Sequence, residues 1–434
     1  MISSTLPESR ISKISDSNGI RVFKIKSDKF NTNTINICIH DQLIKERASF
    51  NAILPSVLMR GCVAFPTSQD IFIELENLYG AFFEYGTIKK GERQIIQFHI
   101  EYISDKYVND KMNLTEKSFD FLYEIILNPL LEHKVFKNEY VEQEKNHLAK
   151  KIRSRINNKN QYAIARCFEK MCNGEPFYIY EKGSIEDLHN IDSDTLYEYY
   201  CSLIEHAPID VYLCGEFSDD KIKYILSKLS RIKRSSKLNR IEPPIIKKEI
   251  QNVKEINEFI NIEQAKLSLG FRTNIPPNND SYYALLVYKS ILSGGTHSKL
   301  FQNVREKMGL AYYVMLRLEK FKGLMVISCG IDSSNKEKTF DIIIKQMEEM
   351  KKGNISDYEY ECALKWIETG INSLKDSQLN IVDFYISQSI VGIEDSFDSV
   401  IEKIRKVKKE DLVTLSKSIK LDTVFFLTSK TDQL

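Results

Sequence analysis

The sequence lacks several features that would assign it to a class at once. No stretch of its 434 residues approaches the run of about 18 apolar residues that spans a bilayer, so we expect no membrane partner. The residues Met1–Pro7 lack the basic and then apolar layout of a secretory signal, which favours the cytoplasm. The 61 basic and 60 acidic residues leave a formal net charge of +1, and this balance argues against a nucleic-acid partner.

The patterns typical of disulfide frameworks and metal sites are also missing. The eight cysteines include no Cys-x-x-Cys pair, so we expect reduced thiols in largely apolar surroundings. No two of the seven histidines lie about three to five residues apart, as zinc ligands on a helix or finger do. The sequence therefore predicts neither a self-contained metal site nor a cofactor.

What the sequence does contain is a repeated order of elements. Hydrophobic residues make up 42% and aromatic residues 11%, as expected for folded domains. In each half, one helix closed by glycine precedes a second helix stopped by glycine, and two strands rich in β-forming residues follow. Gly295 follows Gly61 by 234 residues, and Gly309 follows Gly80 by 229. The expected elements are residues 54–61, 71–79, 81–85 and 94–100 in the first half and 282–292, 298–308, 310–316 and 324–329 in the second.

The ends of the two halves match as well. Capping patterns that end at Leu196 and at Leu412 each open a helix, and these leucines lie 216 residues apart. A closing strand follows each helix, at residues 211–214 and 424–427. These landmarks in the same order indicate an ancient duplication. We expect each copy to be an α+β domain with helices on one face of a twisted sheet.

We place the two copies at residues 1–235 and 251–434, joined by a linker at 236–250. Residues 221–240 carry eight basic and no acidic side chains, and Pro243-Pro244 then breaks any helix. One interpretation of this run is an anion or nucleic-acid patch. The scarcity of interleaved aromatics favours the alternative, a solvated helix face that leads into the linker.

Two segments resemble the insulinase/pitrilysin family of zinc metallopeptidases. Residues 292–312, LSGGTHSKLFQNVREKMGLAY, look like the family's glycine turn, helix, and arginine followed seven residues later by tyrosine. Residues 51–61 and Gly80-Ala81 look like the frame of the catalytic helix. The resemblance covers nearly the whole chain. It implies two insulinase-like α/β sandwich domains, of the LuxS/peptidase metalloenzyme type, that form a clamshell chamber.

The family's catalysis depends on an inverted zinc motif, His-x-x-Glu-His, on one helix. The histidines bind the ion and the glutamate activates a water molecule. Aligning Gly61 with the glycine that follows this motif places Ala52, Pro55 and Ser56 at the three positions. Alanine has no donor atom, proline is no base, and serine is a poor zinc ligand. The resemblance therefore implies a degenerate zinc motif, with no metal and no catalytic residue.

A different alignment does not restore the motif, because no histidine lies between His40 and His99. Glu144 falls near the position of the family's distant zinc ligand, but one carboxylate does not hold zinc. We expect Glu144 to be a solvated helical glutamate beside Lys145.

The second half departs less from the family. Arg305 and Tyr312 occupy positions at which family members bind the substrate backbone and stabilise the tetrahedral intermediate. Gly294 and Gly295 match the flexible glycine stretch that contacts substrate. The structural alternatives are a surface charge, a core aromatic and a helix stop. The order of the residues favours the functional interpretation for Arg305 and Tyr312, whereas both interpretations stay open for the glycines.

A chain that has lost the zinc ligands but keeps this arginine and tyrosine indicates a division of labour. Several branches of the family are heterodimers with one zinc-bearing subunit, and this chain is most similar to the non-catalytic YfmF-like branch of Gram-positive bacteria, linked by name to elongation factor P modification. We expect an inactive, substrate-binding or regulatory subunit whose partners are a zinc-bearing sister subunit and a peptide or unfolded polypeptide. The alternatives are a purely structural scaffold and, last, an enzyme of different chemistry.

Overall fold

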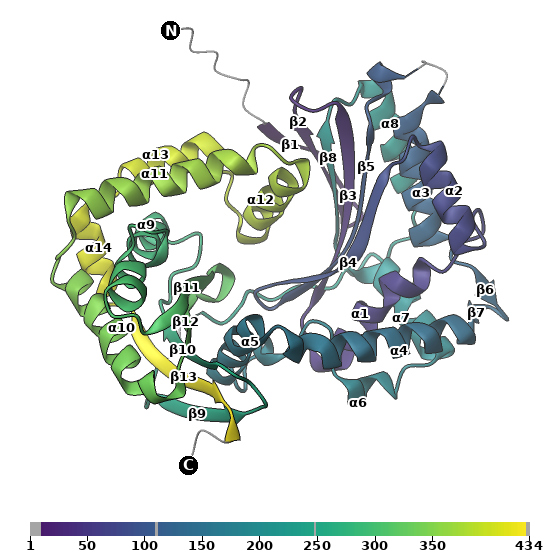
Figure 1. Cartoon of the computed structure of the whole chain (residues 1–434). Coiled ribbons are helices and arrows are strands. Elements are labelled where there is room, and N and C mark those ends of the chain that lie inside the picture. The colour runs from purple at the N-terminus through teal and green to yellow at the C-terminus, as the bar shows by residue number, and fades with distance from the viewer. Residues whose placement is uncertain (1–9, 109–111, 247–248, 431–434) are drawn as a thin grey trace, which may run out of the picture. The chain divides into compact units, whose positions relative to one another are not determined.

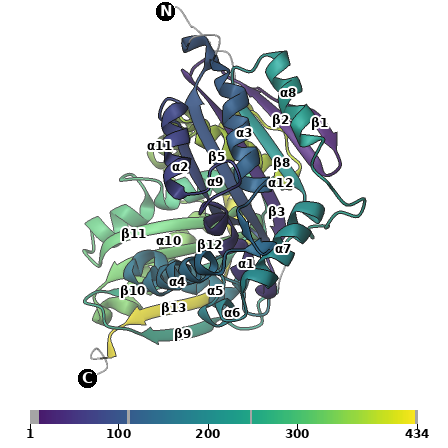
Figure 2. The same ribbon diagram turned by 90° about the vertical axis from the view of Figure 1, so that its right-hand side faces the viewer.

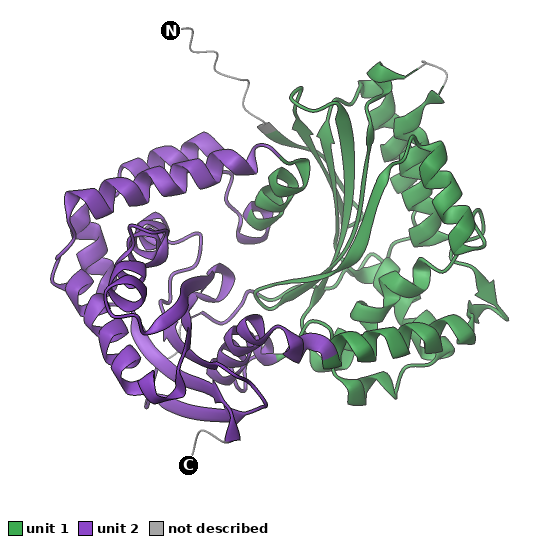
Figure 3. Ribbon diagram, viewed as in Figure 1, with its two compact units in different colours: residues 1–153, 179–242, 377–387 green, residues 154–178, 243–376, 388–434 purple. Residues whose placement is uncertain are grey.

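The computed structural model describes residues 10–108, 112–246 and 249–430, which belong to two compact units (Figures 1 and 3). Unit 1 comprises residues 1–153, 179–242 and 377–387, and unit 2 comprises residues 154–178, 243–376 and 388–434. Each unit thus contains a segment from the other half of the sequence. These ranges differ from a division at 236–250 because the two exchanged segments pack on the opposite unit, which local sequence patterns do not signal.

Unit 1 is built on a six-stranded sheet with the strand order β1-β2-β8-β3-β5-β4. Neighbouring strands are antiparallel except for the parallel pair β2 and β8. Strand β3 is buried along most of its length, whereas β1 and β4 form the sheet edges. The strands are β1 (Arg10–Ser17), β2 (Ile20–Lys26), β3 (Thr32–Gln42), β4 (Phe82–Lys90), β5 (Arg93–Ile103) and β8 (Ile209–Gly215); β6 (Leu131–Glu132) and β7 (Val135–Phe136) form a separate hairpin.

Helices cover one face of this sheet, as Figure 2 shows for α3, α7 and α8. Their apolar side chains join those of the strands in one core, which includes Phe98, Phe121 and Leu196. Helix α7 begins at the capping residue that the sequence predicts, because the carboxylate of Asp192 accepts the Thr195 N–H at 2.9 Å. The helices are α1 (Lys45–Leu58), α2 (Ser68–Asn77), α3 (Leu114–Leu127), α4 (Asn138–Ser154), α6 (Ile185–Leu188), α7 (Ser193–His206) and α8 (Asp219–Leu229), with a 3₁₀ turn at Asp105–Tyr107.

Unit 2 repeats this plan with a five-stranded sheet in the order β11-β12-β10-β13-β9. Only β13 and β9 are parallel. The order matches β4-β5-β3-β8-β2 of unit 1, including the position of the parallel pair, so the predicted duplication of an α+β fold is confirmed. The strands that follow Ala81 and Gly309 hold the same edge in both sheets. The strands of unit 2 are β9 (Lys254–Phe259), β10 (Ala265–Arg272), β11 (Ala311–Glu319), β12 (Leu324–Ile331) and β13 (Lys420–Thr428).

One helix on the sheet of unit 2 comes from the first half of the sequence. Helix α5 (Lys159–Met171) packs Cys167 and Phe168 against a core that includes Val326 and Phe425. A Cβ atom at Gly270 of β10 would lie 2.4 Å from the sulfur of Met171, so glycine permits this close approach. The other helices are α9 (Tyr282–Ser293), α10 (Lys336–Lys351), α11 (Asp357–Leu374), α13 (Phe397–Arg405) and α14 (Lys409–Ser416), with short helices at Arg155–Asn157, Pro176–Tyr178, Lys320–Lys322 and Ser333–Asn335; α12 (Gln378–Val391) divides between the units.

A cluster of buried charges fixes the exchanged segment 154–178 on unit 2. Arg272, which is fully buried, donates from Nε to Asp422 at 2.8 Å and from a terminal nitrogen to Glu175 at 2.8 Å. The ammonium of Lys322 lies 2.9 Å from the second oxygen of Glu175. Because every charge has an opposite partner, the desolvation cost of the cluster is offset by pairing.

Two further predictions can be compared with the structure. The helix expected at residues 298–308 is present and is a π-helix over Phe301–Glu306, in which the N–H of Lys307 donates to the carbonyl of Gln302 at 2.9 Å. None of the eight cysteines, all of which lie in the described ranges, forms a disulfide, and six are buried, as expected. Within the described ranges, no helix has the length and apolar character that crossing a bilayer requires.

Candidate functional site

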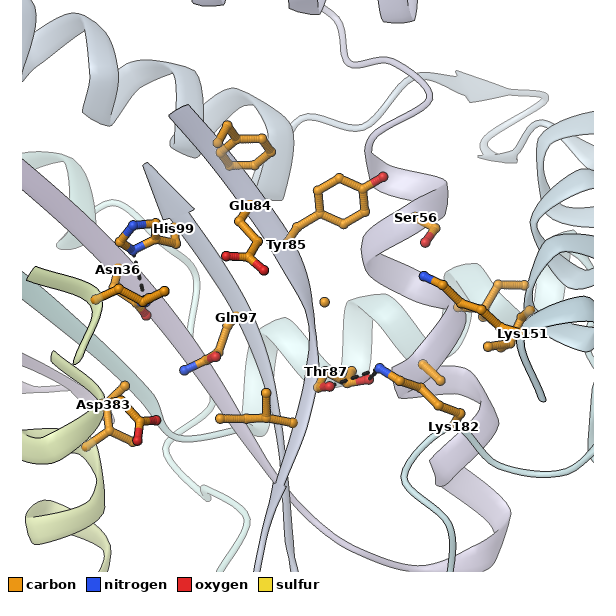
Figure 4. Close-up of a pocket in the computed structure, with 18 of the residues that line it drawn as sticks. Asn36, Ser56, Glu84, Tyr85, Thr87, Gln97, His99, Lys151, Lys182 and Asp383 are labelled. Atoms are coloured by element: carbon orange, nitrogen blue, oxygen red, sulfur yellow. Dashed lines mark hydrogen bonds between the residues drawn. The ribbon is translucent and has the colours of Figure 1, made fainter. Parts of the chain in front are cut away.

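A pocket of about 910 Å³ lies in unit 1 beside the edge strand β4. Its walls come from strands β3 to β5, helices α1 and α4, the loop that contains Lys182, and the part of α12 that belongs to unit 1. Figure 4 shows polar side chains from these elements around the pocket.

Helix α1 places two positions of the degenerate zinc motif in the pocket wall. Ala52 and Ser56 line the pocket, whereas Pro55 is buried within α1 and does not line it. A methyl group and a hydroxyl cannot replace two imidazole ligands, so these residues do not fit zinc. Among the residues that the structure describes, no three His, Cys, Asp or Glu side chains gather as metal ligands.

Glu144 lines the same pocket, and the expectation that it is solvated beside Lys145 is wrong. Its side chain is only 11% exposed, and one oxygen lies 2.8 Å from Nε of Arg60. Lys145 instead pairs with Glu142 at 2.6 Å. The structure thus brings Glu144 together with Ala52 and Ser56, the positions to which the family alignment relates it. Its carboxylate is committed to an arginine.

Strand β4 offers an edge to the pocket because, among the described strands, it pairs with β5 alone. The loop at Lys182 closes one end of this edge. The ammonium of Lys182 donates to the carbonyl of Thr87 at 2.9 Å and to its hydroxyl at 2.8 Å. Lys89, two residues further along β4, donates to the carbonyl of Ile179, three residues before Lys182, at 2.9 Å. The part of β4 before Thr87 has no such cross-connection among the contacts of the described residues.

The wall opposite α1 is polar. His99 of β5 is 3% exposed, and its Nδ1 lies 3.4 Å from the side-chain nitrogen of Asn36. Burial lowers the pKa of His99 to about 4, which keeps the ring neutral at pH 7. The ring of Phe82 meets His99 edge-on, with centroids 6.3 Å apart. The neutral ring of His99 can form hydrogen bonds without bringing a charge of its own.

Helix α12 supplies a third wall, although it comes from the second half of the sequence. Gln378 is 3% exposed; it accepts the hydroxyl of Thr34 at 2.5 Å and donates to the carbonyl of Thr32 at 2.8 Å. Asp383 lies 2.7 Å from the ammonium of Lys90. These contacts fix the start of α12 on the sheet of unit 1.

Sequence reasoning did not find most of these lining residues. Lys151, Lys182 and Asp383 are ordinary charges of helices and loops, and only the fold brings them to one pocket. The available signal was in β5, where Gln97 and His99 interrupt an apolar strand at alternate positions.

The glycines of the second half lie in unit 2, where close packing accounts for both. Gly294 ends helix α9, and a Cβ atom there would lie 2.4 Å from Oγ of Ser290. A Cβ atom at Gly295 would lie 3.2 Å from the ring of Trp366. A contact of these glycines with substrate stays a prediction.

Arg305 and Tyr312 also lie in unit 2, and both are exposed. Arg305 is at the end of the π-helix; its side chain is 46% exposed, and its guanidinium lies 5.0 Å from the ring centre of Phe301. Tyr312 is 72% exposed, which excludes a core aromatic. The register of β11 against β12 shifts between Ala311 and Tyr313, so Tyr312 is the bulged residue of an edge strand.

A β-bulge re-aims a side chain and is common next to functional sites. Gly309 has a φ of +59°, which lets the chain turn between the π-helix and β11. The contacts of the described residues include none between Arg305 and Tyr312. Their convergence on one substrate group therefore stays a prediction.

Comparison with known proteins agrees with this geometry. A sequence profile described as "Peptidase M16 inactive domain" matches residues 190–365. The "Probable inactive metalloprotease YmfF" of Bacillus subtilis (strain 168) is 32% identical over 94% of this chain and 96% of that protein. The "Uncharacterized zinc protease YmxG" of the same strain is 23% identical over 55% of this chain and 57% of that one.

A solved structure supports the fold. The crystal structure of a conserved protein from Enterococcus faecalis V583 matches with a TM-score of 0.89 and 24% identity, over 98% of this chain and 99% of that one. This likeness concerns the fold alone. The sequence match to the inactive metalloprotease over nearly the whole chain decides the family. The chain belongs to the M16 family of metallopeptidases, the insulinase/pitrilysin family, and within it resembles an inactive member.

Proposed function

We propose that this chain is the catalytically inactive, substrate-binding subunit of a two-subunit zinc peptidase. Its partner is a zinc-bearing relative of the same family, and its ligand is a peptide or an unfolded polypeptide. Arg305 and Tyr312 contribute to the partner's active site, where they hold a peptide carbonyl and stabilise its oxyanion. In this proposal the protein works in the cytoplasm; the link to elongation factor P stays a prediction.

The observation that carries the proposal is the state of the pocket in unit 1. The wall positions that would hold zinc are Ala52 and Ser56, yet a cavity of about 910 Å³ remains beside the open part of β4. An exposed strand edge binds an extended peptide through its backbone groups, whatever the peptide sequence. A chain that served only as a scaffold would have no need of an open pocket beside a free strand edge.

The exposed pair in unit 2 supports the second part of the proposal. Tyr312 stands at a bulge of the edge strand β11 with 72% of its surface exposed. An exposed arginine and tyrosine are free to meet a ligand held by another subunit. Relatives described as zinc proteases supply candidates for that subunit.

The test is a turnover assay with the zinc-bearing partner. Arg305→Ala and Tyr312→Phe should each lower kcat about 10²–10³-fold, the usual loss when an oxyanion donor is removed. Complex formation, followed by analytical ultracentrifugation, should not change. The isolated chain should cleave no peptide.

Tyr358→Phe is the matched control, because Tyr358 is 68% exposed on α11 and lies outside the signature. It should leave kcat unchanged. Unchanged turnover with Arg305→Ala and Tyr312→Phe in a properly assembled pair would instead support a purely structural scaffold.

A further inference from the structure

The edge strand β4 is open at one end of the pocket and closed at the other. Its closed end is the Thr87 carbonyl, which accepts the ammonium of Lys182 at 2.9 Å. The loop that carries Lys182 is held in place, because the side chain of Gln94 donates to the carbonyl of Glu181 at 2.6 Å. Gly183 has a φ of +73° and packs closely on Ser49. A Cβ atom at position 183 would lie 2.8 Å from the Cα atom of Ser49, so glycine is required there. A peptide that pairs with β4 therefore meets Lys182 at a fixed position.

Two ammonium groups face the pocket at this closed end. Lys182 and Lys151 both line it, and Figure 4 shows the amino group of Lys151 pointing from α4 into the pocket on the side of Ser56. Burial lowers the pKa of Lys182; the charge of Glu181 opposes this shift, and that of Lys151 adds to it. Among the described residues, Lys182 forms no ion pair. Its positive charge is thus partly desolvated, near a like charge.

Two of the three carboxylates that line the pocket have partners other than Lys182. Glu144 is paired with Arg60 at 2.8 Å, and Asp383 with Lys90 at 2.7 Å. Glu84 is three positions from Thr87 along β4. Because successive side chains of a strand alternate between its two faces, the side chains of Glu84 and Thr87 leave opposite faces of the sheet. Figure 4 shows Glu84 on the side of His99. A carboxylate brought by a ligand is therefore the group that complements Lys182.

We propose that the pocket binds an extended peptide segment that carries a carboxylate at the closed end of β4, where Lys182 and Lys151 hold it. This inference rests on the proposed function, because it names the class of peptide that the same pocket selects. The carboxylate is either an aspartate or glutamate side chain or the free carboxyl terminus of the peptide. In both cases the ligand supplies the negative charge that complements the ammonium of Lys182.

The test uses the full chain and three fluorescent peptides of about eight residues with the same apolar sequence. One is neutral with an amidated end, the second is amidated with one glutamate, and the third has a free carboxyl terminus. Binding is followed by fluorescence anisotropy. At least one of the acidic peptides should bind about tenfold or more tightly than the neutral one, because hydrogen bonds to charged groups are the stronger ones. Which of the two it is distinguishes the side chain from the terminus.

Variants then assign the effect to the lysines. Lys182→Gln removes the charge but keeps an amide donor for the Thr87 carbonyl, and Lys182→Arg keeps the charge. Lys182→Gln and Lys151→Gln should each weaken the acidic peptide about tenfold and leave the neutral one unchanged, whereas Lys182→Arg should retain most of the preference. Lys150→Gln is the control, because Lys150 is exposed on α4 and does not line the pocket.

Two negative results have different meanings. If neutral and acidic peptides bind with equal affinity and Lys182→Gln changes neither, the carboxylate preference is wrong and peptide binding itself stands. If none of the three peptides binds, both the inference and the substrate-binding role of unit 1 fail.

Discussion

The pocket of unit 1 and the segment of the π-helix and β11 in unit 2 differ in how far their polar side chains are exposed. In the pocket, Glu144 lies against Arg60 at 2.8 Å and is only 11% exposed, and His99 is 3% exposed. In unit 2, the side chain of Arg305 is 46% exposed and Tyr312 is 72% exposed. Both regions border the same edge of their respective sheets. The corresponding sheet edges thus carry a pocket with buried and paired polar groups in unit 1 and an exposed arginine and tyrosine in unit 2.

This difference has a consequence for what mutations can reveal. Polar groups enclosed by the chain contribute to folding as well as to binding, because an unpaired buried group loses its solvation. Exposed groups contribute little to folding, so their removal tests function with little structural effect.

The largest loss of folding stability is expected when the buried Arg272 is replaced. Arg305 is the matched comparison, because it is also an arginine of unit 2 but is exposed. Arg272→Met leaves Glu175 and Asp422 without their shared partner, and losing one member of a buried charge cluster costs about 3–5 kcal/mol. Arg305→Met should change the free energy of unfolding by less than about 1 kcal/mol. Urea denaturation followed by the fluorescence of Trp366, the single tryptophan and a residue of unit 2, measures both.

A small loss of unfolding free energy for Arg272→Met would contradict the difference between buried and exposed groups, since it would show that the buried charge cluster contributes little to stability. Glu175→Gln is the companion variant, because it removes a charge from the exchanged segment but keeps its shape. It should destabilise unit 2 in the same direction.

The second prediction compares two histidines that line the same pocket. Folding lowers the pKa of His99 from 6.5 to about 4 because the ring is buried. Between pH 6.5 and about pH 4, His99 is therefore protonated in the unfolded chain and neutral in the folded chain. The folded state loses stability as the pH falls through this range. Between pH 7 and pH 5 this amounts to about 2 kcal/mol.

His99→Gln should flatten the pH dependence of unfolding in this window by about that amount. His147→Gln, at a histidine that lines the same pocket but has a side chain 61% exposed, is the matched control for the loss of an imidazole. Burial also lowers the pKa of His40, but His40 is present in both proteins, so the difference isolates His99. The same slope in wild type and His99→Gln would show that the pocket admits the charged ring.

The overall architecture could be predicted from the sequence because it depends on patterns that repeat. The glycine stops at Gly80 and Gly309 and the cap at Asp192 are local signals, and the structure places their elements in equivalent positions. The exchange of residues 154–178 and 377–387 could not be predicted in this way. It depends on packing between distant segments, such as the contact of Met171 with Gly270, for which neither residue gives a local cue.

The site was partly predictable for the same reason. Aligning Gly61 located Ala52 and Ser56, and both line the pocket. Lys182 was not found, because its interest comes from the carbonyl of Thr87, 95 residues away in the sequence. Glu144 lines the same pocket, but the expectation that it is solvated was wrong, since its ion pair with Arg60 depends on how α4 meets the end of α1. A sequence shows which groups a site has lost more easily than which interactions replace them.

The smallest effect is expected for the exposed pair itself. The double variant Arg305→Ala/Tyr312→Phe should change the urea midpoint, read from Trp366, by less than the equivalent of about 1 kcal/mol. It removes an exposed ion pair with Glu306 at 3.6 Å and a cation–π interaction of Arg305 with Phe301, and exposed interactions of both kinds are weak. A loss of stability close to that of Arg272→Met would mean that the bulge of β11 depends on these side chains, and a fall in turnover would then reflect folding. A negligible loss would mean that a fall in turnover does not reflect folding, and it would then support the proposed contribution of Arg305 and Tyr312 to a partner's active site.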